Sequence, residues 1–144
     1  MRYIGFIALL VMSTFASPVS PAEFLPGQVW SYKTRAGESD STLTILKVEN
    51  YSDLGRVVHI RVDGVRIKNA LRGNTVIEVP HLPFKEAAVQ ASVTKLLRTL
   101  DKTPDFQDGY ETWKQAYLAR QGGAFSIPVR ETLDAMVKAN WETK

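Results

Sequence analysis

The spacing of hydrophobic residues changes along the chain, from a period of two residues to a period of about 3.6. From residue 28 to residue 79, apolar and polar positions mostly alternate between turn-forming residues, which is typical of β-strands. From residue 84 onward, apolar residues recur every three or four positions, which is typical of amphipathic helices. Strands followed by helices form the order of an α+β fold, and this is the fold class that the sequence predicts.

The first half predicts a meandering antiparallel sheet of about five strands. The first strand covers 28–35, and the second covers 42–49, where apolar residues on both faces indicate either a bulge near Ile45 and Leu46 or burial on both sides. The last strand of the sheet, 75–79, is expected to end at Pro80. The connections are too short to hold crossover helices, so neighbouring strands should be antiparallel.

The segment 55–68 predicts a hairpin at the centre of this sheet. Two alternating runs flank Asp63 and Gly64, a pair of residues that favours a two-residue type I′ turn. In that register Val62 faces Val65 on the buried side, and Ile60 faces Ile67.

The other face of the predicted hairpin is basic. It carries His59, Arg61, Arg66 and Lys68, with Arg61 opposite Arg66 and His59 opposite Lys68. Like charges directly across two strands destabilise a sheet mildly, unless an acidic group lies against them. These four residues are therefore the predicted binding residues.

The second half predicts three C-terminal helices packed on one face of the sheet. The first runs from about Phe84 to Leu100, and the second begins near Asp108 and stops at Gly122 and Gly123. A short edge strand is expected at 124–127, and the last helix begins after Pro128.

The N-terminus has the features of a signal peptide, predicted to cover residues 1–22. Arg2 precedes an apolar run from Ile4 to Phe15, and cleavage is expected after Ala22, or alternatively just before Ser17. An apolar run of about 12 residues is shorter than the roughly 20 needed to span a bilayer, so stable membrane insertion after cleavage is not expected. Residues 23–144 then form a single domain of a periplasmic or secreted bacterial protein.

Composition narrows the function classes. The chain contains no cysteine, so an exported form must be stabilised by packing without disulfides, which favours a bacterial envelope. Its formal net charge of +3 is nearly balanced, which argues against nucleic acid as a partner.

The sequence shows no catalytic signature. It lacks serine-nucleophile motifs and phosphate-binding glycine loops, and its two histidines, His59 and His81, have no metal-ligand spacing. No catalytic residue, metal or cofactor is therefore assigned.

Two functions remain. The first is a non-enzymatic binding protein of the bacterial envelope, resembling an inhibitor or an immunity protein in size, which recognises another protein or an acidic ligand through the basic face. The alternative is a small periplasmic hydrolase or isomerase with His59 or His81 as general base. A pocket that holds a buried histidine beside a carboxylate would favour the enzyme, whereas a flat or convex basic face with exposed aromatic residues would favour the binder.

Overall fold

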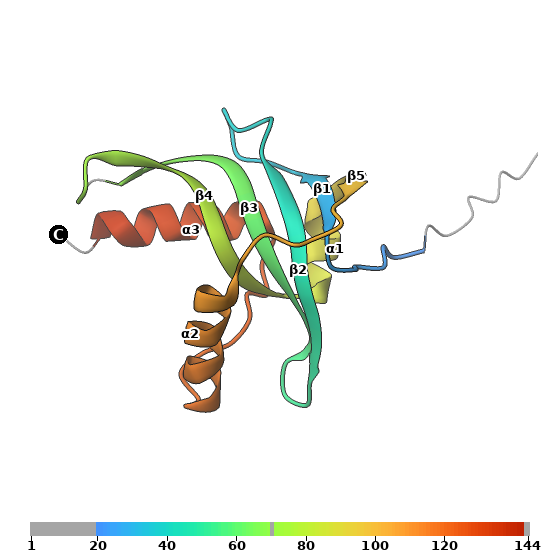
Figure 1. Ribbon diagram of the computed structural model, residues 1–144. Helices are drawn as coiled ribbons and strands as arrows, with labels where there is room; N and C mark the ends of the chain where they lie inside the picture. Colours follow the sequence, from blue (N-terminus) through green and yellow to red (C-terminus); the bar gives the residue numbers. More distant parts are fainter. Residues whose placement is uncertain (1–19, 70, 143–144) are drawn as a thin grey trace, which may run out of the picture.

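The computed structural model describes residues 20–69 and 71–142. Within them, five strands form one antiparallel sheet in the order β4-β3-β2-β1-β5, and three helices complete an α+β fold (Figure 1). The predicted fold class is therefore confirmed. The strands are β1 (Gln28–Tyr32), β2 (Thr42–Tyr51), β3 (Gly55–Asn69), β4 (Asn74–Lys85) and β5 (Val93–Thr99).

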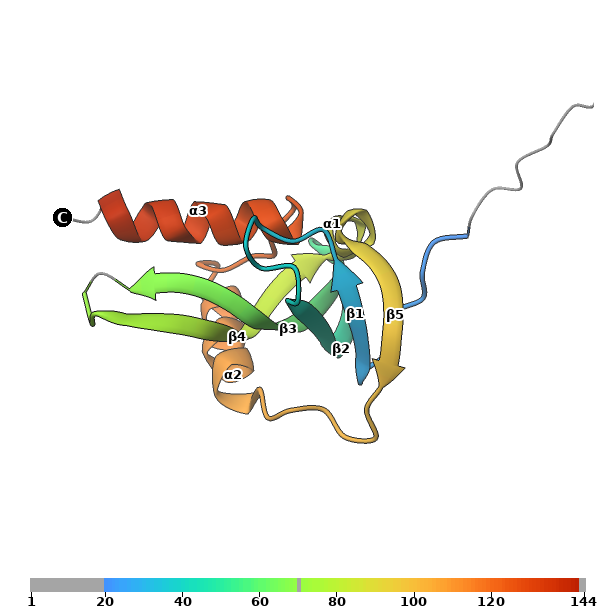
Figure 2. The ribbon, with the colours of Figure 1, turned by 90° about the horizontal axis from the view of Figure 1, so that it is seen from above.

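The helices lie on both faces of the sheet, whereas the sequence predicts them on one. They are α1 (Glu86–Ser92), α2 (Gln107–Leu118) and α3 (Val129–Glu142). Figure 2 shows α1 and α3 above the sheet and α2 below it. The reason lies in β3, where His59 and Ile60 are both fully buried but point to opposite faces, so each face needs a cover.

β3 is one continuous strand, and the predicted hairpin turn at Asp63 and Gly64 is wrong. The register with β4 slips between Asp63 and Ile67, so this segment is a β-bulge. Gly64 has a φ of +77°, which glycine adopts without the steric cost that a side chain would add. The turn that joins β3 to β4 lies further along the chain, between Asn69 and Asn74.

The bulge explains why the predicted buried residues are correct although the predicted pairs are wrong. Val62 lies opposite Leu43 and Val79, not Val65, and Arg61 lies opposite Thr44, not Arg66. The bulge switches the buried positions from even to odd residue numbers. The buried side of β3 therefore carries Val58, Ile60, Val62, Val65 and Ile67, as predicted.

β4 continues past Pro80, where the sequence predicts its end, and reaches Lys85. Because β4 is at the edge of the sheet, it can contain prolines, whose missing N–H groups would break a central ladder. Ile60 pairs with Leu82, and Val62 pairs with Val79. One residue of β3 therefore lies opposite two residues of β4, so β4 contains one extra residue there. This second bulge contains Pro80 and His81.

The predicted helix from Phe84 to Leu100 is only helical in its first part. α1 ends at Ser92, and Val93 begins β5, which pairs antiparallel with β1. The helical spacing of apolar residues is present, but the free edge of β1 offers backbone hydrogen bonds, and β-branched residues such as Val93 and Thr94 fit a strand. One consequence is that Leu96 is 41% exposed.

The other predicted elements are closer to the structure. The register of β2 slips between Ile45 and Lys47, which confirms the bulge. The last helix begins at Val129, directly after Pro128. The segment 124–127 forms a single parallel bridge between Phe125 and Phe84 instead of an edge strand.

The main hydrophobic core lies between the sheet and the two helices α1 and α3. Its largest side chains include Phe24, Leu43, Ile60, Phe84 and Leu133, all fully buried. The burial of these apolar side chains is the main source of stability in a domain without disulfides.

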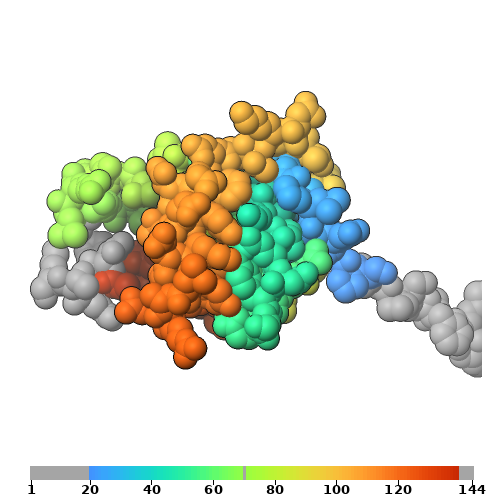
Figure 3. Space-filling model, turned by 60° about the horizontal axis from the view of Figure 1, so that its bottom comes forward, coloured from blue at the N-terminus to red at the C-terminus, as the bar shows by residue number. Residues whose placement is uncertain are grey.

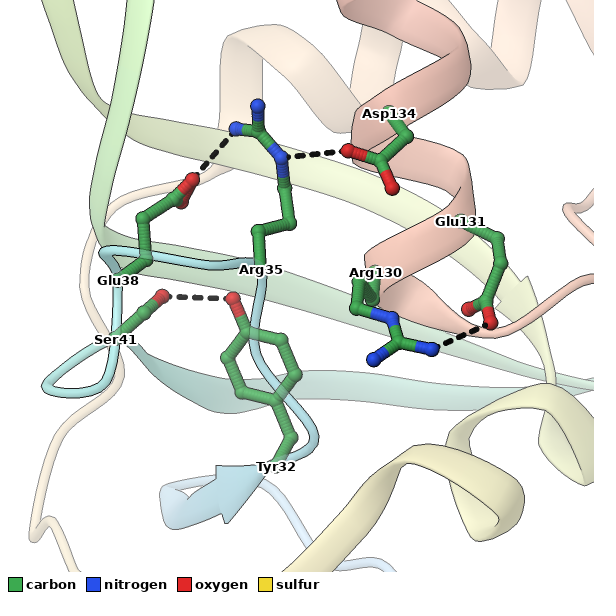
Figure 4. A network of polar contacts seen from close by, with 7 residues as sticks. All are labelled: Tyr32, Arg35, Glu38, Ser41, Arg130, Glu131 and Asp134. Atoms are coloured by element: carbon green, nitrogen blue, oxygen red, sulfur yellow. Dashed lines mark hydrogen bonds and ion pairs between the residues drawn. The ribbon is translucent and has the colours of Figure 1, made fainter.

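Arg35 ties the loop between β1 and β2 to α3 (Figure 4). Its guanidinium lies 2.5 Å from Glu38 in the loop and 2.8 Å from Asp134 in α3. Glu38 is buried, so this ion pair is better shielded from solvent than most surface pairs.

The same loop also contacts the bulge of β3. The Tyr32 and Ser41 hydroxyl oxygens lie 2.7 Å apart (Figure 4), and Ser41 donates a hydrogen bond of 2.7 Å to the carbonyl oxygen of Asp63. A Cβ atom at Gly64 would lie 3.1 Å from the Cα of Ser41. A side chain at residue 64 would therefore press on this loop.

The predicted signal peptide lies mostly outside the described residues, and cleavage after Ala22 stays a prediction. The backbone of Ala22 donates one hydrogen bond to the side chain of Gln90 and accepts another from it. Among the described residues, Phe24 is the first along the chain that is fully buried in the core. None of the helices in the described part of the chain has the length and hydrophobicity that crossing a bilayer requires.

Candidate functional site

The four predicted binding residues lie on the α2 face of β3, but they differ in exposure. His59 is fully buried, Arg61 is half-buried, and Arg66 and Lys68 are exposed. The residues of this face have odd numbers before the bulge at Gly64 and even numbers after it, so all four side chains lie on the same face. The face is therefore not one continuous basic surface.

Arg61 is held by acidic neighbours of the same sheet. Its Nε atom lies 3.0 and 3.1 Å from the two carboxylate oxygens of Asp63, and its Nη2 atom bonds to Glu78. Asp63 and Glu78 are cross-strand partners, so Arg61 neutralises two carboxylates that would otherwise repel each other.

Arg66 and Lys68 lie on the part of the β3–β4 hairpin beyond the bulge. We call this part, residues 65–69 and 71–77, the hairpin arm. Figures 2 and 3 show the arm extending past the rest of the sheet. One side of the arm packs against α3 through Ile67 and Val76. The opposite side is uncovered in the described structure, and Ile77 is 63% exposed there.

A second group of residues, which the sequence does not predict as a unit, lies beneath α2. The Nδ1 atom of His59 is 2.9 Å from the Nε2 atom of His81, and the Nε2 atom of His59 is 3.5 Å from a carboxylate oxygen of Glu49. We call these three residues the Glu49–His59–His81 cluster. The β4 bulge places His81 beside His59, with the ring centroids 5.1 Å apart and the ring planes inclined by 19°.

Helix α2 closes this cluster. Tyr110 and Trp113 place their rings edge-on to His59, with centroids 5.2 and 4.8 Å away. The indole Nε1 of Trp113 donates a hydrogen bond of 2.7 Å to the carbonyl oxygen of Gly123, which anchors the helix to the segment that follows it. Figure 3 shows α2 lying across this face of the sheet.

Hydrogen bonds keep Glu49 ionised. Tyr110 donates to one carboxylate oxygen at 2.5 Å, Tyr51 donates to the other, and Lys47 lies 3.1 Å away. Burial alone would raise the pKa of Glu49, but the bonds from Tyr110, Tyr51 and Lys47 outweigh it and lower the pKa to about 2.

Burial keeps both histidines neutral. Desolvation, with a contribution from the neighbouring His81, lowers the pKa of His59 to about 4, although Glu49 opposes this shift. Burial also lowers the pKa of His81. At neutral pH the cluster therefore contains one carboxylate and two uncharged imidazoles.

Two surface cavities meet at His81 and Gly109. The smaller has a volume of about 370 Å³ and lies at the start of α2. The larger has a volume of about 540 Å³. Its apolar lining is formed by Leu82, Pro83, Trp113, Ala116, Ala124 and Phe125.

The residues that the structure describes contain no group of three or more acidic, histidine or cysteine side chains that could hold a metal ion. The smaller cavity contains Asp105 and Asp108 beside His81, but these residues do not form such a group.

No protein-family model, curated protein or solved structure matches this chain. Its function must be inferred from the chain's own geometry. Two surfaces are available for that inference, the hairpin arm and the cavity beside the Glu49–His59–His81 cluster.

A weak signal for the cluster is present in the sequence. His59 and His81 are the two histidines of the chain, and prolines flank the segment around His81, at Pro80 and Pro83. Prolines inside a strand indicate an edge or a bulge. The contact between Glu49 and His59 depends in addition on the bulge in β2. No rule of residue spacing predicts the exact residue at which that bulge occurs.

Proposed function

We propose that the protein is a small exported binding protein of the bacterial envelope, of the inhibitor or immunity type. The open side of the hairpin arm holds an acidic surface of another protein. The observation that carries this proposal is the pair Arg66 and Lys68, which are exposed beside the exposed Ile77 and make no hydrogen bond or ion pair within the described residues.

Charge supports an acidic partner. Between Gly64 and Ile77 the sequence contains three basic residues, Arg66, Lys68 and Arg72, and no acidic residue. A local surplus of one charge on a protrusion attracts a partner of opposite charge and increases the association rate.

The shape of the arm also supports contact with a protein surface. Ile77 lies on the same side as the two cations, and Leu71 is 81% exposed in the turn. Apolar side chains flanked by arginine are typical of the centres of protein interfaces. The other side of the arm is supported by α3, so this surface is presented on a packed element.

The test compares three forms of the mature protein immobilised for capture from envelope extract of the native host. They are the wild type, Arg66→Ser with Lys68→Ser, and the control Lys95→Ser with Arg98→Ser. The control removes the same charge from exposed positions of β5, at the opposite edge of the sheet. We expect one protein to be retained by the wild type and the control, released by salt, and lost from the arm variant. Equal retention by all three forms would contradict the proposal.

The alternative, a hydrolase or isomerase with a histidine base, gains one observation and lacks another. His81 lines the larger cavity and contacts His59, and His59 in turn lies beside the carboxylate of Glu49. However, within the described residues no side-chain nucleophile is hydrogen-bonded to His59 or His81. The two histidines are hydrogen-bonded to each other instead. The cluster therefore supports ligand binding better than covalent catalysis.

A further inference from the structure

We propose that the larger cavity beside α2 binds a small neutral aromatic molecule with one weakly acidic O–H group, of the phenol class, and that Nδ1 of His81 accepts its hydrogen bond. This site is separate from the hairpin arm and does not depend on the function proposed for it.

Glu49 fixes the position of the proton on the His59 ring. Glu49 is a carboxylate, which can only accept hydrogen bonds. One of its oxygens lies 3.5 Å from Nε2 of His59, in a part of the protein from which solvent is excluded. An unprotonated Nε2 would direct its electron pair at this negative charge, so the favoured tautomer carries the proton on Nε2. Nδ1 of His59 is then an acceptor.

His59 in turn fixes the position of the proton on the His81 ring. Nδ1 of His59 lies 2.9 Å from Nε2 of His81, so Nε2 of His81 must donate the hydrogen bond. Neutral imidazole carries one proton, which leaves Nδ1 of His81 as an acceptor. Glu49 therefore determines the tautomer of a histidine that it does not contact.

His81 lines both cavities, and its Nε2 is directed inward to His59. Nδ1 is therefore the ring nitrogen left for a ligand in a cavity. Gly109 also lines both cavities, and a Cβ atom there would lie 2.8 Å from Cβ and 3.6 Å from Nδ1 of His81. The missing side chain lets α2 pack directly against His81 without covering Nδ1 with a side chain of its own.

The lining of the larger cavity defines the ligand class. Its other polar side chains are already engaged, because Thr112 donates to the carbonyl oxygen of Asp108, and Trp113 donates to Gly123. The rings of Trp113 and Phe125 favour an aromatic ligand. A volume of about 540 Å³ with few polar groups is within the range of small-molecule sites. With both histidines neutral, a neutral hydrogen-bond donor fits better than an ion.

The first experiment measures the tautomers by long-range ¹H–¹⁵N NMR at neutral pH. We expect His59 and His81 both to carry the proton on Nε2, and we expect Glu49→Gln to abolish this strict preference. A proton on Nδ1 of His81 in the wild type would overturn the proposal.

The second experiment compares two probes, phenol and benzene, which differ by the hydroxyl group and are both uncharged at neutral pH. NMR titration of the wild type should show about tenfold tighter binding of phenol, the contribution expected of one hydrogen bond. His81→Phe should remove this preference and retain benzene binding. Ala116→Phe, which fills the cavity from α2 without changing a histidine, should abolish binding of both probes and covers the case in which His81→Phe does not fold. Equal affinity of the wild type for the two probes, or no binding of either, would overturn the proposal.

Discussion

The side chains of His59 and His81 lie 2.9 Å apart between Nδ1 and Nε2, although the residues are 22 positions apart in the sequence. This contact joins β3 to the bulge of β4, and one of the two partners is fully buried. A buried imidazole pair is stable only while it is uncharged, because a proton added there would have to be desolvated. The folded state therefore resists protonation at this position.

Stability should fall as the pH decreases through the range in which unfolded histidine titrates. The pKa of His59 is lowered from 6.5 to about 4, so the unfolded chain takes up the proton first. This contribution is fully present above about pH 6.5 and is lost as the pH falls toward 4. The difference corresponds to about 3 kcal/mol of unfolding free energy, measured by urea denaturation at a series of pH values.

The control is a variant in which His59 and His81 are both replaced by phenylalanine, which contains no histidine. Lys47 and Tyr110, which also lie near the pair, do not titrate in this range, since the pKa values of both are raised above already basic values. Glu49, with a pKa of about 2, contributes only below about pH 4.5. The same loss of stability in the variant and the wild type would show that the pair is not its source.

Local patterns predicted much of the sheet, and the largest error came from a glycine. Asp63 and Gly64 between alternating runs have the sequence of a tight turn, and the required positive φ at Gly64 is present. A bulge uses the same conformation, however. The choice between turn and bulge depends on Ser41 and on β2, which contact this position only after folding.

The helix predicted up to Leu100 failed for a related reason. Its apolar residues satisfy a helical period, but Val93 to Thr99 pair with β1, which would otherwise expose an open edge. A free strand edge elsewhere in the molecule is not visible in a local window of sequence.

The candidate site was the least predictable part. His59 and His81 were identified singly, and their contact with each other and with Glu49 requires an extra residue in β4 and a register slip in β2. Each bulge displaces side chains by one position, so an alternation rule assigns the neighbours of both histidines incorrectly.

The two arginines of the predicted binding face should differ in their effect on stability. Arg61→Ser removes the cation between Asp63 and Glu78, which face each other across β3 and β4. We expect a loss of about 1 kcal/mol at low salt, decreasing as salt screens the two carboxylates. Urea denaturation at two salt concentrations measures both effects.

Arg66→Ser is the matched control, because Arg66 is exposed on the same face and makes no hydrogen bond or ion pair within the described residues. Its effect should be within about 0.5 kcal/mol at either salt concentration. Equal effects of the two substitutions would mean that Arg61 does not relieve repulsion between Asp63 and Glu78.

Gly64→Ala should destabilise the protein more than Gly73→Ala. Both glycines have positive φ values, +77° and +67°, so both substitutions carry a conformational cost of about 1–2 kcal/mol. Only at Gly64 would the new Cβ atom also press on a neighbour, at 3.1 Å from the Cα of Ser41, whereas the space around Gly73 is open. We expect the difference in unfolding free energy between the two variants to be about 1 kcal/mol or more.

The comparison of Gly64→Ala with Gly73→Ala also tests whether contact with Ser41 stabilises the bulge of β3. Both substitutions have the same backbone cost, and only the one at Gly64 adds a contact with Ser41. Ser41→Ala keeps the close approach and removes the hydrogen bonds to the Asp63 carbonyl and to the buried Tyr32 hydroxyl, so it should cost about 1–3 kcal/mol by itself. If Gly64→Ala and Gly73→Ala had the same effect, the loop would be able to move away from the bulge. Ser41 would then not be what distinguishes a bulge from a turn at this position.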